Sequence, residues 1–227
     1  MLAAGPGASE PKAVLELFTS QGCSTCPPAD KLINEYAKRD DVLALSFNVD
    51  YWDYLGWKDT LGSPENSDRQ RAYAAARGDR QVYTPHIVVN GDEHVVGSNR
   101  RAVESAMQRD GALPVSIMLE EKDDAISVKV KDNGTNIDHA SLWLALFQKE
   151  VTVPIGRGEN TGRTITYSNV VKKLRPIALW NGDEMSVDLP KSEMAKAKAK
   201  NCAVILQAET KSGLPGRILG AATLDLN

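Results

Sequence analysis

A pair of cysteines separated by two residues constrains the fold of this chain more than any other feature. Cys23 and Cys26 follow an apolar run rich in strand formers, residues 13–19, and precede apolar residues at helical spacing over residues 32–37. The CxxC motif is therefore predicted to lie in the turn between a strand and the N-terminus of a helix. Unpaired backbone N–H groups and the helix dipole stabilise a thiolate there, so a cysteine becomes a nucleophile near neutral pH.

A CxxC motif also occurs in structural zinc sites and in structural disulfides. A structural zinc site needs about four ligands, usually two such pairs or one pair with histidines. The chain has three cysteines and three histidines, and no two histidines have the H-x₃₋₅-H spacing. The sequence therefore disfavours zinc. It leaves an inert structural disulfide as the alternative to a redox-active pair, and the strand–turn–helix setting favours the redox type.

Length and composition limit the remaining possibilities. The 227 residues exceed a single core of about 100–150 residues, so two domains are expected. A net charge of −3 does not indicate the basic surface that nucleic-acid-binding proteins carry. No apolar run approaches the roughly 20 residues of a membrane span. The composition therefore predicts a globular protein that neither binds nucleic acid nor spans a membrane.

The first half alternates strands and helices. Residues 1–12 are predicted to be a flexible tail and residues 13–112 a domain of mixed strands and helices. The run Val42–Val49 is apolar throughout, as in a strand covered on both faces. The predicted elements are a strand over 13–19, a helix opening at Pro27, a strand over 42–49, a helix from about Ser67 to Gly78, a strand from His86, a hairpin turn at Asn90-Gly91, a return strand over 94–97 and a helix ending at Gly111.

This order, with CxxC after the first strand and Thr84-Pro85 before the third, resembles the thioredoxin superfamily. The resemblance covers roughly the first half and implies a mixed four-stranded sheet with helices. It further implies that the peptide bond before Pro85 is cis, that Pro85 packs against the cysteine pair, and that the backbone at Thr84 pairs with an extended substrate. The Ser-Thr dipeptide between the cysteines departs from the Gly-Pro of thioredoxins, and this turn tunes thiolate stability.

Two longer strings narrow the resemblance. The sequences of residues 16–30 and 49–59 resemble those of a bacterial family of exported thioredoxin-like proteins that is known only as a domain of unknown function. This likeness extends over the full length. It implies a periplasmic or secreted protein whose signal peptide is no longer part of this sequence.

An aromatic loop follows the second strand. Asp50 begins it, and Tyr51, Trp52, Tyr54 and Trp57 follow within a few positions. The carboxyl ends of parallel strands meet at one edge of the sheet, so this loop is expected beside the CxxC turn. Two interpretations remain open: the rings and Asp50 contact a substrate, or the rings pack as a lid or domain interface.

From residue 113 the pattern changes to alternation with period two. About seven short strands separated by turn signals predict a β-sandwich-like domain over residues 113–227. The loop 156–163 carries glycines and arginines, but a strand rather than a helix follows it, so a long hairpin that touches the first domain is preferred to a phosphate-binding loop. Cys202 opens an apolar run and is expected to be a buried core thiol.

Three functions follow from these features. The first is a thiol–disulfide oxidoreductase acting on a protein or small-molecule disulfide: Cys23 attacks, Cys26 resolves, Glu16 accepts the Cys26 proton, and no metal or organic cofactor is needed. The second is a Cu(I)-binding protein with Cys23, Cys26 and His86 as ligands, since soft thiolates favour Cu(I). The third is a binding module that keeps the fold without turnover.

Overall fold

The structure, a computed structural model, describes residues 8–131, 139–196, 199 and 201–225. Its strands are β1 (Ala8–Ser9), β2 (Ala13–Thr19), β3 (Val42–Asn48), β4 (His86–Val89), β5 (Glu93–Val96), β6 (Ile117–Glu121), β7 (Ala125–Val130), β8 (Ala140–Pro154), β9 (Thr164–Trp180), β10 (Met185–Pro190), β11 (Asn201–Glu209) and β12 (Pro215–Asp225). Its helices are α1 (Pro27–Tyr36), the short 3₁₀ helix η1 (Asp53–Leu55), α2 (Pro64–Ala76), α3 (Arg100–Asp110) and α4 (Ser192–Lys196). None of these helices is long and apolar enough to cross a membrane.

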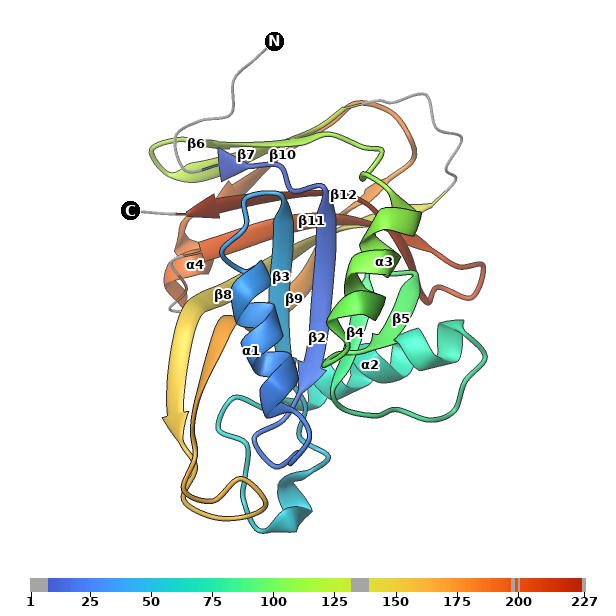
Figure 1. Cartoon of the computed structure of the whole chain (residues 1–227). Helices are drawn as coiled ribbons and strands as arrows, with labels where there is room; N and C mark the ends of the chain where they lie inside the picture. The colour runs from blue at the N-terminus through green and yellow to red at the C-terminus, as the bar shows by residue number, and fades with distance from the viewer. Residues whose placement is uncertain (1–7, 132–138, 197–198, 200, 226–227) are drawn as a thin grey trace.

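Most strands belong to one mixed sheet that runs through the molecule (Figure 1). Within the described residues it has nine strands in the order β1-β12-β11-β8-β9-β3-β2-β4-β5, and β10, β7 and β6 form a second sheet. Strands β2 and β3 are parallel, whereas β2 with β4 and β4 with β5 are antiparallel. The predicted mixed α/β architecture of the first half is therefore present.

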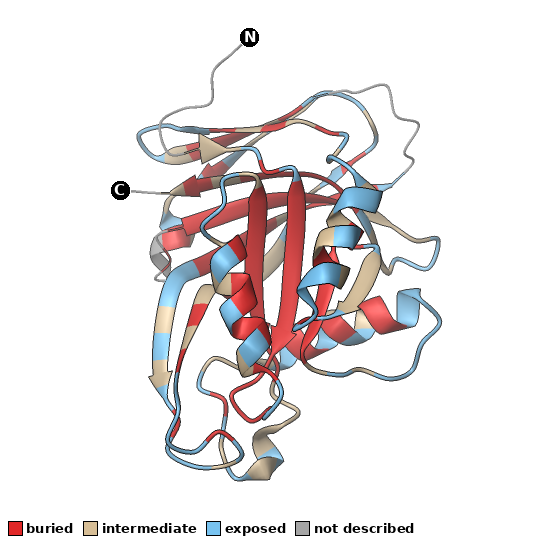
Figure 2. Ribbon diagram, in the orientation of Figure 1, coloured by how far each residue is buried: buried red, intermediate tan, exposed pale blue. Residues whose placement is uncertain are grey.

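Helices cover both faces of the first-half strands. Because side chains alternate along a strand, Leu15 and Leu17 of β2 pack with α1 and α3, whereas Val14 and Phe18 pack on the opposite face with Tyr73 of α2. Strands β2 and β3 are buried along their whole lengths, as Figure 2 shows. The prediction of a strand covered on both faces is confirmed for β3.

The boundary between the two halves differs from the prediction of two separate domains. Strand β9 pairs in parallel with β3 at Ser46 and Val170, so the second half extends the sheet of the first half. Ser46 Oγ donates to the Ser168 carbonyl over 2.7 Å, and Asn169 Nδ2 donates to the Ala44 carbonyl over 2.8 Å. A sandwich is formed, but one of its two layers is continuous with the first-half sheet. Strand pairing across the halves is a long-range choice that local alternation does not encode.

Two further predictions need correction. Residues 8–12 are not a free tail, because β1 pairs with β12 and Glu10 Oε1 accepts a hydrogen bond from the Ile117 amide; residues 1–7 lie outside the described residues. Helix α2 begins at Pro64 rather than near Ser67, because Ser63 caps it by accepting a hydrogen bond from the Asn66 amide.

Gly91 lies where the β4–β5 turn of the first half approaches β12 of the second half. The amide of Ile218 in β12 donates to the Asn90 carbonyl at the β4–β5 turn. The next residue, Gly91, has a φ of 75°, and a Cβ there would lie 2.4 Å from the Gly216 carbonyl oxygen. Gly78 has a similar φ of 74° with no atom within 4 Å of such a Cβ, so it is a matched control.

Gly91→Ala should lower the free energy of unfolding by roughly 3 kcal/mol, because strain of the left-handed backbone adds to the clash with β12. Gly78→Ala should cost roughly 1 kcal/mol from backbone strain alone. Urea unfolding of both variants measures the difference. Equal losses would contradict the close approach of the turn to β12.

Candidate functional site

The cysteine pair lies at the N-terminus of α1 as a disulfide. The Cα atoms of Cys23 and Cys26 are 5.4 Å apart. Cys26 is the N-cap residue of α1, and its carbonyl accepts hydrogen bonds from the amides of Ala29 and Asp30. Cys23 is 4% exposed and Cys26 is fully buried, so an incoming sulfur atom meets Cys23 first. The predicted order of exposure is confirmed.

Pro85 lies beside this turn. The Thr84–Pro85 peptide bond is cis, as predicted. A Cβ added at Gly97 would lie 3.2 Å from the Cβ atoms of both Ala29 and Pro85, and the Gly97 amide donates to the Pro85 carbonyl over 2.9 Å. Gly97 therefore fills the narrow space between the first turn of α1 and Pro85, and its lack of a side chain permits that approach.

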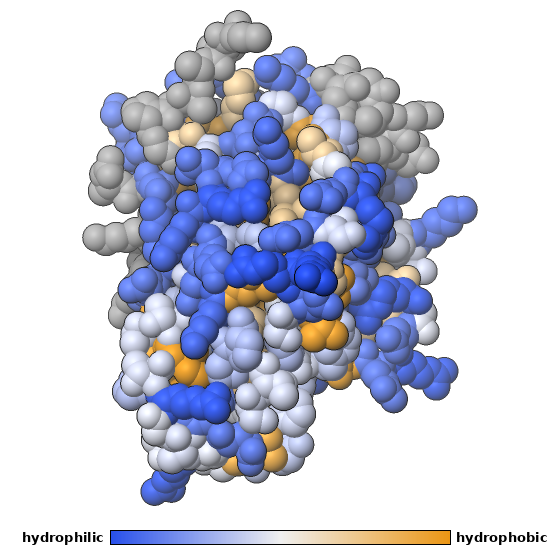
Figure 3. Space-filling view, in the orientation of Figure 1, coloured by the Kyte–Doolittle hydropathy of each residue, from blue (hydrophilic) through white to orange (hydrophobic). Residues whose placement is uncertain are grey.

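The aromatic loop connects the CxxC turn to the cis proline. Trp52 Nε1 donates to Thr84 Oγ1 over 2.8 Å, and a Cβ at Gly22 would lie 3.1 Å from the Trp52 Cβ. Tyr54 stacks on Trp52 and is 76% exposed. In Figure 3 the lower end of the molecule, where the loop lies, is mostly pale, which marks intermediate hydropathy. Blue, hydrophilic residues predominate over the middle of the same face. The loop thus borders the site, as predicted.

Other residues of the loop hold it in place. Tyr51 OH donates to Gln70 Oε1 over 3.0 Å, and burial raises the pKa of Tyr51 to about 12. Asp50, which we expected to orient a substrate, accepts a hydrogen bond from Ser67 Oγ over 2.5 Å. Asp50 and Tyr51 therefore tie the loop to α2, and a structural role accounts for both.

Trp57 joins the loop to the second half. Its Nε1 donates to Gln21 Oε1 over 2.7 Å, and its ring would lie 3.2 Å from a Cβ at Gly156 in the β8–β9 hairpin loop. The interpretation of the loop as a domain interface therefore holds for Trp57, and substrate contact stays a prediction. Trp52 reaches the cysteine turn and the cis proline, whereas Trp57 packs between the halves.

The β8–β9 hairpin loop contributes a residue that the sequence analysis missed. Asn160 is fully buried, and its Nδ2 donates to the carbonyls of Gln21 and Cys23, each over 2.9 Å. The hairpin does touch the first half, as predicted, and it does so at the CxxC turn. The glycines around it signalled a loop, but nothing local indicated what the asparagine would bind.

A second missed residue is a buried carboxyl. Asp30 follows Cys26 by four residues, so it lies one helical turn further along α1. Thr19 Oγ1 donates to Asp30 Oδ1 over 2.7 Å, and Oδ2 has no hydrogen-bond partner within the described part of the chain. Burial, with a contribution from nearby Asp59, raises the pKa of Asp30 to about 8. The spacing from Cys26 was a signal in the sequence that could have identified it.

The environment of Asp30 contains further polar groups from both halves. Asp59 accepts hydrogen bonds from the amides of Gln21 and Leu61, and burial raises its pKa above the usual range. Tyr167 of β9 is fully buried without a hydrogen-bond partner for its hydroxyl in the described structure, and burial beside Asp30 raises its pKa strongly. The CxxC turn therefore has a polar interior behind it.

Glu16 does not lie beneath the cysteines, which corrects its predicted role. It alternates along β2 with Leu15 and Leu17, which face α1, so its side chain lies on the opposite face. There it forms an ion pair with Arg69 over 2.8 Å and accepts a hydrogen bond from the Tyr73 hydroxyl. These contacts hold Glu16 on the α2 side.

His86 is also directed away from the cysteines. Its ring packs against Phe18 on the α2 face, and its nitrogens lie 3.2 Å from Gln70 Nε2 and 2.9 Å from His94 Nδ1. Burial lowers the pKa of His86 to about 3. No three His, Cys, Asp or Glu side chains among the described residues are arranged to hold a metal ion. The copper ligand set of Cys23, Cys26 and His86 is therefore not assembled.

Comparison with known proteins places the chain in a family. Residues 14–207 match the family described as "Protein of unknown function (DUF1223)". The chain belongs to the DUF1223 family. This match agrees with the expected resemblance to a family known only as a domain of unknown function. No curated protein matches the chain.

Two solved structures resemble this DUF1223 protein. A crystal structure of a protein from Agrobacterium tumefaciens is 38% identical, with a TM-score of 0.85, covering 96% of this chain and 95% of that one. A protein named HBP35 from Porphyromonas gingivalis is 14% identical, with a TM-score of 0.64, covering 97% of this chain and 76% of that one. The second likeness concerns the fold alone.

Asp30→Asn should remove a pH dependence of stability. A carboxyl whose pKa is raised from 3.8 to about 8 binds its proton more tightly in the folded than in the unfolded chain, so stability falls as the pH rises from about 4 to about 8. The asparagine cannot ionise and keeps an acceptor for Thr19. At pH 8 the variant should be more stable than the parent by on the order of 5 kcal/mol, with little difference at pH 4.

Urea unfolding across this pH range measures the effect. Asp41→Asn is a suitable control, because its pairing with Arg39 lowers its pKa. That variant should be less stable than the parent at pH values above the ordinary carboxyl range, where the parent's Asp41 is ionised and paired with Arg39, and the two should converge at low pH. Parallel pH profiles of Asp30→Asn and the parent would show that Asp30 is not a protonated buried acid.

Proposed function

We propose that this DUF1223 protein is a thiol–disulfide oxidoreductase with a thioredoxin-like first half. The observation that carries the proposal is the Cys23–Cys26 pair, which lies at the N-terminus of α1 beside the cis Pro85. The strand order β3-β2-β4-β5, with α1 and α3 on one face and α2 on the other, supports the thioredoxin-like assignment. The activity needs only the two cysteines and a substrate disulfide or dithiol.

The exchange proceeds through a mixed disulfide. In the reduced protein the Cys23 thiolate attacks one sulfur of the substrate disulfide, the substrate S–S bond breaks, and the other substrate sulfur leaves as a thiolate. Cys26 then loses its proton and attacks Cys23 Sγ, which breaks the mixed disulfide and releases the second substrate thiolate. Two electrons pass from the protein thiols to the substrate, and the Cys23–Cys26 disulfide is formed. The same steps in reverse oxidise a substrate dithiol.

Asp30 is the proposed acid–base group for Cys26. Cys26 is fully buried, so its proton has no direct exchange with bulk water. Asp30 lies one helical turn away, and a pKa of about 8 lets it take or give a proton near neutral pH. It accepts the proton of the Cys26 thiol during resolution and returns it when the disulfide is reduced. This assignment replaces the predicted role of Glu16.

The surface beside Cys23 offers contacts suited to an extended polypeptide or a small disulfide. The Thr84 backbone precedes the cis Pro85 beside α1, and Trp52 fixes the Thr84 side chain through its indole N–H. Backbone groups next to a reactive cysteine can pair with an extended chain, and aromatic rings supply contact area at little entropic cost. Export, which the family resemblance implies, would place the pair in an oxidising compartment that favours the disulfide form.

Matched cysteine variants test the function. Reduced Cys26→Ser should form a stable mixed disulfide with a peptide that contains one disulfide, because no resolving thiol remains. Reduced Cys23→Ser should form little, because Cys26 is fully buried. Mass spectrometry of the adducts measures both. Cys202, which is fully buried in β11 and whose pKa is raised by burial to about 12, should stay unmodified in both variants.

Two other outcomes of this experiment would contradict the proposed roles. If neither variant forms an adduct and the parent disulfide resists reduction by dithiothreitol, the pair is a structural disulfide and the protein is a binding module. If Cys23→Ser reacts faster than Cys26→Ser, the roles of the two cysteines are reversed.

Trp52→Phe should slow the reaction with a peptide disulfide by about fivefold, because Thr84 loses a hydrogen bond of roughly 1 kcal/mol. Tyr54→Phe, at the exposed ring that stacks on Trp52, should change the rate little. Stopped-flow kinetics and the thermal midpoint Tm of each variant give the comparison. A large loss of Tm in Trp52→Phe with an unchanged rate would mean that Trp52 serves only to hold the halves together.

A further inference from the structure

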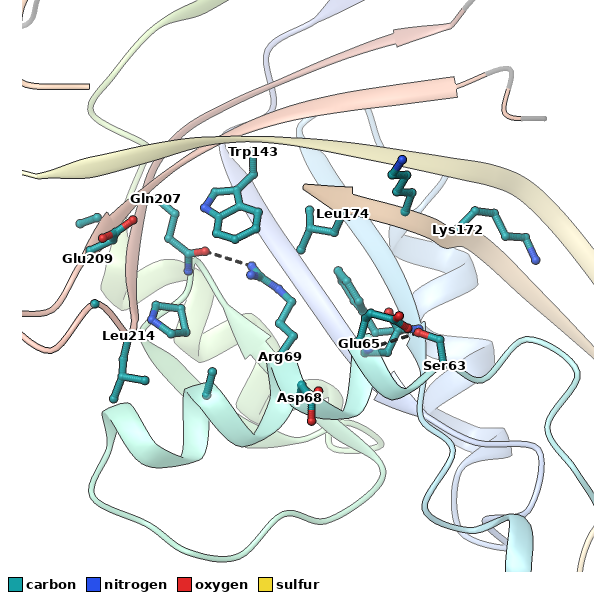
Figure 4. A pocket seen from close by; sticks show the side chains of 17 residues that line it. Ser63, Glu65, Asp68, Arg69, Trp143, Lys172, Leu174, Gln207, Glu209 and Leu214 are labelled. Atoms are coloured by element: carbon teal, nitrogen blue, oxygen red, sulfur yellow. Dashed lines mark hydrogen bonds between the residues drawn. The ribbon is translucent and has the colours of Figure 1, made fainter. Parts of the chain in front are cut away.

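A cavity of about 630 Å³ lies on the α2 face of the sheet, away from α1 and its cysteine pair. Figure 4 shows it between α2 and the strands of the second half, with Arg69 rising from α2 beneath the Trp143 ring. Its volume is within the range of about 300–1,000 Å³ that is typical of small-molecule sites. The proposed disulfide exchange does not use it.

On the α2 side of the cavity lies the guanidinium group of Arg69, which hydrogen bonds hold in position. The Arg69 side chain is only 9% exposed, and its Nε donates to Glu16 while its Nη2 donates to Tyr73 OH and Gln207 Oε1. Its Nη1 makes no hydrogen bond to any described residue, although Arg69 lines the cavity. These contacts fix the guanidinium plane and leave its remaining donors for a ligand. A charged donor held in this way selects a carboxylate or a similar oxyanion.

A β-bulge adds two lysines to the same cavity. Leu146 is opposite Lys173 and Phe147 is opposite Val171, so Lys172 is the extra residue of β9. In a regular strand, successive side chains point to opposite faces. The bulge re-aims them, so Lys172, Lys173 and Leu174 all line the cavity.

The two lysines are available for a ligand. Neither Lys172 nor Lys173 forms a salt bridge within the described residues, and burial lowers the pKa of Lys172. Both lysines are exposed, so their ammonium groups can move to meet an anion bound in the cavity.

The opposite side of the cavity is apolar. The Trp143 ring lies over the Arg69 guanidinium, with 5.8 Å between the ring centroid and the guanidinium carbon. Leu174 and Leu214 also line the cavity. Such a wall accepts an aromatic ring or an alkyl chain and removes it from water. One part of the ligand is therefore charged and the other part apolar.

Acidic residues on the lining limit the charge of the ligand. Glu16 already balances Arg69, Asp68 is paired with Arg71, and Glu209 accepts a hydrogen bond from Ser141. Glu65 adds a further carboxylate at the edge. The lining thus sets Arg69, Lys172 and Lys173 against Glu65, Asp68 and Glu209 and has no excess positive charge, so the free side of Arg69 and the two lysines offer a place for one anionic group and not for several.

We propose that this cavity binds a small organic monoanion, a carboxylate attached to an aromatic or alkyl body. The carboxylate lies between Arg69 Nη1 and the bulge lysines, and the body lies against Trp143 and Leu174. The site belongs to both halves, since α2 supplies the arginine and β8 and β9 supply the rest.

Calorimetric titration of the whole, disulfide-bonded protein tests the proposal with two probes, 1-naphthaleneacetate and decanoate, each compared with its own amide. The amides keep the apolar body and lose the charge. We expect saturable binding of at least one carboxylate with one site per chain, and binding of its amide weaker by about tenfold, as loss of a charge-assisted hydrogen bond requires. Absence of saturable binding of both carboxylates at millimolar concentration overturns the proposal, as does equal binding of acid and amide.

Variants locate the site. Lys172→Gln combined with Lys173→Gln should reduce the preference for the carboxylate over the amide while leaving the amide affinity unchanged, and Trp143→Leu should weaken both ligands. Lys31→Gln, at an exposed lysine on α1, is the matched control and should behave as the parent. An unchanged preference in the double lysine variant would place the anion elsewhere. Because the titration uses the oxidised protein, failure of disulfide exchange would not affect it.

Discussion

The parallel contact between β3 and β9 is the constraint on which both candidate sites depend. It continues the sheet of the first half into the second at Ser46 and Val170. On one side of this contact β9 carries Tyr167, whose hydroxyl lies in the polar interior behind the CxxC turn. Further along the same strand, the bulge at Lys172 opens onto the cavity over α2. Neither half alone therefore holds a complete site.

Local patterns predicted the parts of the fold that local chemistry determines. The CxxC turn before α1 and the Asn90-Gly91 turn each depend on residues close in sequence, and both are present. The cis bond before Pro85, which the resemblance to thioredoxins implied, is present as well. The predicted domain boundary did not anticipate that strands of both halves share one sheet, because a period-two pattern shows that a strand has two faces without naming its neighbour. The same limitation explains Glu16. The position of Glu16 in β2 determines which residues share its face of the strand, but which face α1 covers is a tertiary property.

The buried Glu16–Arg69 pair illustrates how the halves are aligned. Removing two charges from water is expensive, and the cost is offset only when each remaining donor and acceptor is bonded. Here Tyr73 donates to the carboxylate and Gln207 of β11 accepts from the guanidinium. The second half thus completes the environment of a charge pair whose members both belong to the first half. A shift of β11 along α2 would leave a buried charged group with an unmet hydrogen bond, which disfavours alternative packings.

Helix α2 is positioned by directional bonds more than by an apolar stripe, which also explains why its start was predicted incorrectly. Its buried side chains include three polar ones, Asn66, Ser67 and Gln70. They bond, respectively, to the Asn48 carbonyl, the Asp50 carboxylate and the Tyr83 carbonyl. Apolar burial tolerates sliding, whereas a hydrogen bond is lost within a few tenths of an ångström. The aromatic loop at the cysteine site and Arg69 at the cavity are both attached to this helix, so both inherit its fixed position.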